Sequence, residues 1–159
     1  MQMGLVQQKD GQIGEHETKY VLSNKRATSM NCWLSKRCEP DPSFPHGIIS
    51  SIYFDTIDWK LLGEKLNSDH LKTKVRLRWY GNPVTGEILP ESFLEYKYKI
   101  GSARKKFRVK TKIDARRLLD KEMESLEFMN IPKIAHEYGV TLPHVLYPAF
   151  QINYTRHRY

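Results

Sequence analysis

Three charged residues near the start of the chain, Glu15, Glu17 and Lys19, stand at alternate positions. In an extended strand alternate side chains point to the same face, so two carboxylates and one ammonium would share a small patch. This patch would add little stability, because the carboxylates repel each other and exposed ion pairs contribute only about 0 to 1 kcal/mol. A divalent cation held by the glutamates, with the lysine reaching a phosphate on that cation, explains the pattern. The alternative is an edge strand whose charges prevent aggregation.

Three later segments are predicted to be strands with one basic face and one largely apolar face. They span residues 73–80, 93–100 and 104–110. The basic residues at alternate positions are Lys74, Arg76 and Arg78 in the first, Lys97 and Lys99 in the second, and Arg104, Lys106, Arg108 and Lys110 in the third. A solubilising surface usually mixes both signs of charge, because like charges on neighbouring strands repel. The bias therefore predicts a bound anion.

The remaining elements suggest how these faces are positioned. Further strands are predicted at residues 15–22, 48–56 and 150–158, after a lead-in at residues 1–14. Helices are predicted at residues 24–37 and 132–139, with two more capped by Asp58 and Asp114. We expect one α+β domain over residues 15–159. Its antiparallel sheet would curl into a barrel or tunnel with a polar interior, and the helices would pack outside.

Composition limits the partners and the compartment. Lys and Arg number 26 against 18 Asp and Glu, which gives a net charge of +8. This excess favours nucleic acid, an anionic membrane surface or a phosphate-rich small molecule. No apolar run approaches the ~20 residues of a membrane span. Two cysteines, Cys32 and Cys38, are predicted to be free thiols, so we expect a cytoplasmic protein.

Five sequence motifs resemble one known family. They are Glu15-x-Glu17-x-Lys19, the segment Ser50-Ser51-Ile52-Tyr53-Phe54-Asp55-Thr56-x-Asp58, Lys74-x-Arg76-x-Arg78-x-Tyr80, Phe93-Leu94-Glu95-x-Lys97, and the basic strand at residues 104–110. In this order they resemble the VTC branch of the CYTH or triphosphate tunnel metalloenzyme superfamily, the catalytic domain of polyphosphate polymerases. The resemblance extends over residues 15–158.

The resemblance implies a tunnel that binds ATP or triphosphate and inorganic polyphosphate, uses Mg²⁺ or Mn²⁺, and transfers the terminal phosphate of ATP to polyphosphate. Glu15 and Glu17 match the metal-binding motif. The expected catalytic residues are Lys19, Arg76, Arg78 and Lys97, and the expected phosphate-binding residues are Lys74, Lys99, Arg104, Lys106, Arg108 and Arg156. No side chain has to act as a nucleophile, because positioning and charge neutralisation carry most of phosphoryl transfer.

The family pattern continues beyond Tyr154-x-Arg156 into further strands, whereas this chain ends at Tyr159. We therefore expect a tunnel that is open along one side. Three explanations for the missing strands remain: the chain is truncated, a second chain or homo-oligomer completes the tunnel, or the domain binds its ligand without turnover. The alternatives to a polymerase are a binding-only polyphosphate or nucleotide module and a triphosphatase. A nucleic-acid-binding domain is disfavoured, because Trp79, Tyr96 and Tyr98 alternate out of the basic faces.

The six histidines are predicted to be solvated or packed. Among them, His16, His46 and His70 lack metal-ligand spacing with another histidine or a cysteine.

Overall fold

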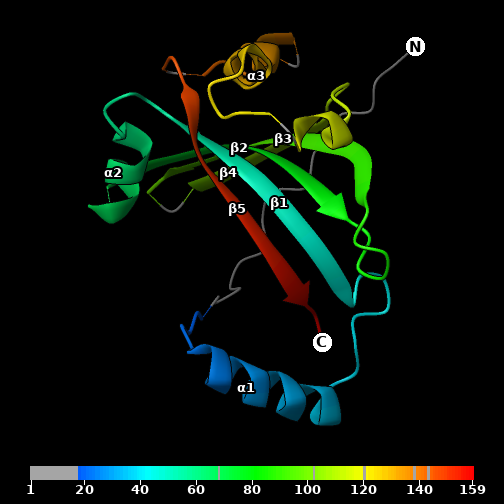
Figure 1. The fold of residues 1–159 in the computed structure, drawn as a ribbon. Coiled ribbons are helices and arrows are strands. Elements are labelled where there is room, and N and C mark those ends of the chain that lie inside the picture. Colours follow the sequence, from blue (N-terminus) through cyan, green and yellow to red (C-terminus); the bar gives the residue numbers. More distant parts are fainter. Residues whose placement is uncertain (1–17, 68, 102, 120, 138, 143) are drawn as a thin grey trace.

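A single antiparallel sheet forms the centre of the computed structural model, which describes residues 18–159 except 68, 102, 120, 138 and 143 (Figure 1). The strands are β1 (His46–Asp55), β2 (Leu71–Gly81), β3 (Ile88–Ile100), β4 (Ala103–Lys110) and β5 (Tyr147–His157). Their order in the sheet is β4-β3-β2-β1-β5, so β2 lies in the middle. The expected α+β class with an antiparallel sheet is confirmed.

The strand register places the basic residues on one face, as the alternation predicts. Arg76 of β2 lies opposite Tyr53 of β1 and Glu95 of β3. One position along, Leu77 lies opposite Leu94. Because cross-strand partners share a face, charged side chains gather on one side of the sheet and apolar side chains on the other. We call these the polar face and the core face.

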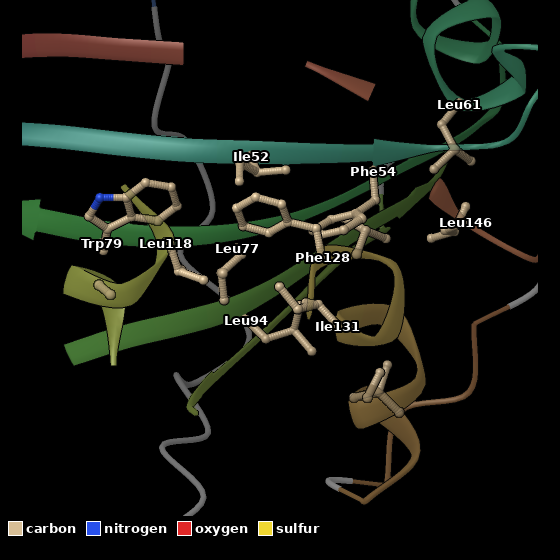
Figure 2. Close-up of a cluster of buried hydrophobic side chains, with 14 residues drawn as sticks. Ile52, Phe54, Leu61, Leu77, Trp79, Leu94, Leu118, Phe128, Ile131 and Leu146 are labelled. Carbon is tan, nitrogen blue, oxygen red and sulfur yellow. The ribbon is translucent and has the colours of Figure 1, made fainter. Parts of the chain in front are cut away.

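The core face is covered by a short 3-10 helix, η1 (Ala115–Leu118), and by α3 (Leu126–Glu137). Figure 2 shows Phe128 and Ile131 of α3 beside Leu77, Leu94 and Ile52 of the sheet. Each of these side chains is almost completely buried. This apolar layer fixes the sheet from one side and leaves the polar face for charged side chains.

The first helix, α1 (Asn24–Arg37), matches its predicted bounds and lies on the opposite side of the sheet from α3 (Figure 1). None of its residues is buried in the described structure. The hydroxyl of Tyr159 donates a hydrogen bond to Asn31, which ties the helix to the residues that follow β5.

The prediction that Asp58 caps the second helix was wrong. In α2 (Lys60–Leu66) the preceding residue Trp59 adopts a left-handed conformation, with φ of 57°. The carboxylate of Asp55, at the end of β1, accepts hydrogen bonds from the backbone N–H groups of Leu61 and Leu62, at 2.8 and 2.9 Å. The turn at Trp59 thus brings a β1 carboxylate, rather than Asp58, onto the first turn of the helix.

Two helix predictions after β4 also had the wrong bounds. Asp114 caps η1 alone, which ends at Leu118, and α3 starts at Leu126 instead of Pro132. Pro132 lies inside α3, where it removes one backbone hydrogen bond. Burial of the apolar side chains on both sides of this proline, including Phe128 and Ala135, offsets that loss.

The predicted first strand is absent from residues 18–22, and its residues 15–17 lie outside the described part of the chain. Among the described strands, β4 and β5 form the two edges, so the sheet is open and is not closed into the expected barrel. Within the described ranges, no helix is long and apolar enough to cross a membrane.

Candidate functional site

One buried carboxylate, that of Glu95, lies at the centre of the polar face with a relative exposure of 2%. Its Oε2 accepts hydrogen bonds from Arg76 Nε at 2.8 Å and from Arg76 Nη2 at 2.5 Å. Its Oε1 lies 3.6 Å from Arg108 Nη1 and 3.9 Å from Arg78 Nη1. Burial alone would raise the pKa of Glu95, but the arginines, Arg76 foremost, lower it below the ordinary value. Glu95 therefore stays ionised and draws three guanidinium groups together.

Neutral hydroxyl groups on other strands orient the same guanidinium groups, and Tyr154 also orients Arg156 of its own strand. The pairs are Arg76 Nη1 with Tyr53 at 2.9 Å, Arg78 Nε with Ser51 at 3.3 Å, Arg78 Nη2 with Tyr154 at 3.4 Å, Arg108 Nη2 with Tyr80 at 3.0 Å, and Arg156 Nη2 with Tyr154 at 2.9 Å. A hydroxyl that accepts a hydrogen bond fixes an arginine without cancelling its charge. The arrangement keeps the arginines both ordered and cationic.

Lysines extend the positive charge beyond the arginines. Lys97 lies opposite Lys74 on β2 and opposite Lys106 on β4 in the register. Burial lowers the pKa of Lys74 to about 8, helped by repulsion from Lys65, Arg76 and other cations. Burial and the charge of Arg76 also lower the pKa of Lys97. Since each cation opposes the protonation of the next, a bound anion would relieve the repulsion.

The charge balance of this face is strongly one-sided. On β2, β3 and β4 its acidic residues are Glu91 and Glu95. The basic residues on the same face are Lys72, Lys74, Arg76, Arg78, Lys97, Lys99, Arg104, Lys106, Arg108 and Lys110. Glu91 lies at the periphery, where it is 3.5 Å from Lys110. The centre of the face thus has one carboxylate for many cations.

The structure brings most of the predicted site residues together on this face. Arg76 and Arg78 are buried beside Glu95. Lys19, in the segment before α1, lies close enough to Lys74 to lower its pKa. Arg156 contacts Tyr154 on β5. At the other end of the face, Lys99 and Arg104 pair across the β3–β4 hairpin, so they are the most distant from the arginine cluster in the register. The predicted metal ligands Glu15 and Glu17 lie outside the described residues.

The role of Glu95 in organising the arginines was not predicted from the sequence. The sequence contained one indication of this role: Glu95 is the acidic residue at the centre of an otherwise basic set of alternating positions. The hydroxyl partners Ser51 and Tyr53 were also missed, because their role depends on the pairing of β1 with β2.

A cavity of about 460 Å³ opens at the end of the polar face where β1 begins and β5 ends. Its walls combine aromatic and apolar side chains with three arginines, among them Phe44, Phe93, Arg108, Arg156 and Arg158. The guanidinium carbon of Arg108 lies 4.1 Å from the centre of the Phe93 ring, and that of Arg158 lies 5.7 Å from the centre of the Phe44 ring. Such walls suit a flat ring that carries a negatively charged group.

A divalent cation does not fit the acidic group at the centre of the face. Both oxygens of Glu95 face arginines, which would repel a cation. Within residues 18–159, apart from the undescribed positions, there is no cluster of three or more histidine, cysteine, aspartate or glutamate residues. Among the described residues, the centre of this face therefore offers no cluster of metal ligands.

The VTC domain family matches residues 14–159, which is nearly the whole chain. The chain belongs to the VTC domain family. This membership points to a role related to polyphosphate and agrees with a face rich in arginine and lysine. No curated protein sequence matches the chain.

Proposed function

We propose that the polar face of this VTC domain binds triphosphate and inorganic polyphosphate and takes part in phosphoryl transfer from ATP to polyphosphate. The observation that carries the proposal is the cluster of Arg76, Arg78 and Arg108 around Glu95, with lysines continuing along β2, β3 and β4. Arginine binds phosphate oxygens through paired hydrogen bonds, and lysine acts as a point charge.

The geometry of the sheet suits a linear polyanion. Neighbouring strands lie about 4.8 Å apart, so a chain of phosphates that crosses the strands meets a new set of cations at each step. From β4 to β2 these sets include Lys106, Lys97 and Lys74, which are cross-strand neighbours. A compact anion such as sulfate would reach only part of this row.

Phosphoryl transfer requires positioning and stabilisation of charge on the transferred group, rather than a protein nucleophile. Arg76 and Arg78 are held by hydrogen bonds before any ligand arrives, so their charges need no rearrangement during the reaction. The cavity beside Phe44 and Phe93 offers a place for the nucleoside of ATP. Mg²⁺ or Mn²⁺, held by Glu15 and Glu17, would neutralise phosphate charge and orient the phosphoryl group when bound.

A binding-only module is the second candidate. It is favoured by the chemistry of the described face, whose central carboxylate is engaged by arginines and provides no metal site. Such a module would bind polyphosphate without forming a product from ATP.

Calorimetric titration with tripolyphosphate, at two salt concentrations and with or without Mn²⁺, tests the binding. Incubation with ATP, followed by analysis for polyphosphate and free phosphate, tests the reaction. Polyphosphate formation supports the transferase. Phosphate release without polyphosphate indicates a triphosphatase, and binding without product indicates the binding-only module. No binding of tripolyphosphate at low salt would overturn the proposal.

Binding is expected to depend on pH through Lys74. Its pKa of about 8 means that the free protein loses this charge as the pH rises from 7 to 9. A bound polyanion favours the ammonium form and raises the pKa again, so binding should take up a proton between about pH 8 and the ordinary lysine value. Calorimetry at pH 8.5 in two buffers of different ionisation enthalpy measures this uptake.

The matched control is Lys74→Arg, which keeps the positive charge but stays protonated throughout this range. In this variant the uptake should disappear, and tripolyphosphate affinity should fall less between pH 7 and pH 9. Equal proton uptake in the parent and the variant would assign the effect to another group.

A further inference from the structure

Two histidines that are far apart in the sequence meet where β1 begins and β5 ends. His46 and His157 are direct partners in the antiparallel register. Their Nδ1 atoms lie 2.8 Å apart, their ring centres are separated by 4.7 Å, and their ring planes are inclined by 80°. Both residues are exposed, so a solvated ion can reach them.

The Nδ1 contact requires one neutral ring to donate a hydrogen and the other to accept it. If the donor ring moves its proton to Nε2, both Nδ1 lone pairs become available without a net loss of protons. Imidazole nitrogen is a preferred ligand for zinc, copper and nickel. We propose that His46 and His157 form a two-histidine site for a transition-metal dication, with Cu²⁺ or Ni²⁺ fitting best.

The separation of the nitrogens in the hydrogen-bonded pair is compatible with this preference. With metal–nitrogen bonds of about 2.0 to 2.1 Å, a spacing of 2.8 Å gives an angle of about 85° at the metal. This is close to the right angle between neighbouring ligands in the tetragonal sites of Cu²⁺ and Ni²⁺. Tetrahedral Zn²⁺ would require the nitrogens to be about 3.4 Å apart. Water or a phosphate oxygen would occupy the remaining positions.

The charges nearest to the pair in the sequence are those of Arg156 and Arg158. Both arginines flank His157 and line the same cavity as His46, so they would oppose a cation. Their guanidinium groups are, however, directed toward aromatic rings: Arg156 lies over Tyr154 and Arg158 lies over Phe44. The repulsion is thus weakened, and the affinity would come from the imidazoles.

A metal bound by His46 and His157 would link β5 to β1. In the described sheet β5 is an edge strand that pairs with β1 alone, and it carries Tyr154 and Arg156. The metal would join the last residue of β5 to the first residue of β1 and hold the end of the strand in register. This consequence for the anion site rests on the proposed function, whereas metal binding itself does not.

The test is a titration of the full chain with Cu²⁺ alone and with Ni²⁺ alone, by calorimetry, with electron paramagnetic resonance of the Cu²⁺ sample. We expect one ion per chain and a spectrum that indicates two nitrogen ligands. His46→Ala and His157→Ala should each weaken binding at least about tenfold, because loss even of an outer partner of a metal ligand typically costs 10- to 100-fold. His136→Ala, which changes an exposed histidine on α3, is the control that should leave the affinity unchanged.

Equal metal affinity in the parent chain, His46→Ala and His157→Ala would overturn the site. Thermal unfolding without metal shows whether each variant is folded. Addition of Ni²⁺ should then raise the unfolding midpoint of the parent chain and leave that of His157→Ala unchanged. Tripolyphosphate titration without transition metal, on the same variants, separates the two proposals. Loss of metal binding with retained anion binding supports the histidine site, while a parent chain that binds metal but no tripolyphosphate contradicts the proposed function alone.

Discussion

Glu95→Gln is expected to lower the free energy of unfolding by roughly 3 to 5 kcal/mol, the usual effect of removing one partner from a buried ion pair. The substitution keeps the size of the side chain but leaves Arg76, which is itself buried, without its carboxylate. Arg78 and Arg108 lose the same neighbour. Urea denaturation followed by circular dichroism, at constant salt and pH 7, measures the change.

The control is Glu91→Gln, which removes a carboxylate from the same strand. Glu91 lies 3.5 Å from Lys110, and both side chains are well exposed, so the expected loss is only about 0 to 1 kcal/mol. Similar small losses for both variants would contradict the organising role of Glu95. By the same reasoning Arg76→Ala should destabilise the fold, so a loss of anion binding in that variant would not by itself identify a ligand contact.

Acid should destabilise the parent chain through the same residue. The pKa of Glu95 is lowered in the folded chain, so the unfolded state binds the proton more readily. The stabilisation is therefore fully present above the ordinary carboxyl pKa and is lost as the pH falls through the lowered folded value. In Glu95→Gln this part of the acid sensitivity should be missing.

Arg78→Ala is expected to weaken tripolyphosphate binding by roughly 10- to 150-fold, which corresponds to the 1.5 to 3 kcal/mol typical of hydrogen bonds to charged groups. Arg78 suits this test better than Arg76, because its nearest contact with Glu95 is 3.9 Å and its side-chain hydrogen bonds to described residues go to the neutral hydroxyls of Ser51 and Tyr154. Calorimetry at physiological salt measures the affinity, and the thermal midpoint reports whether the variant is folded.

Arg117→Ala removes the same charge from another part of the molecule. Arg117 is exposed on η1, which covers the core face. At physiological salt, charges separated by more than about 8 Å are largely screened, so the affinity should change by less than about threefold. Equal losses in Arg78→Ala and Arg117→Ala would mean that overall charge, rather than the polar face, attracts the anion.

The two faces of the sheet were predictable because side chains in a strand alternate with a period of two. Residues 73–80, 93–100 and 104–110 followed this rule, and the register confirms it apart from Lys105, a basic residue opposite Tyr98 on the other face, and a register shift after Trp79. The apolar side chains of the sheet had to be buried from solvent, and the helical segments after β4 could pack on them. The sequence thus contained the polar face and most of the cations on it.

Features that depend on distant pairing were not predictable in this way. The organising role of Glu95 depends on its arginine neighbours on β2 and β4. His46 and His157 are 111 positions apart and become neighbours through the pairing of β1 with β5. Helix bounds failed for a related reason: the burial of Phe128 and Ile131 against the sheet extends α3 across Pro132.

The central position of β2 has a consequence for the selectivity of the site. Both sides of β2 are paired, so its amide hydrogens should be among the slowest in the sheet to exchange with solvent, whereas those of the edge strand β4 should exchange sooner. Arg76 and Arg78 then belong to the part of the sheet that opens last, and Lys106 belongs to a part that can adjust. Rigid arginines would select the phosphate group itself, and the more adaptable lysines would tolerate phosphate chains of different lengths.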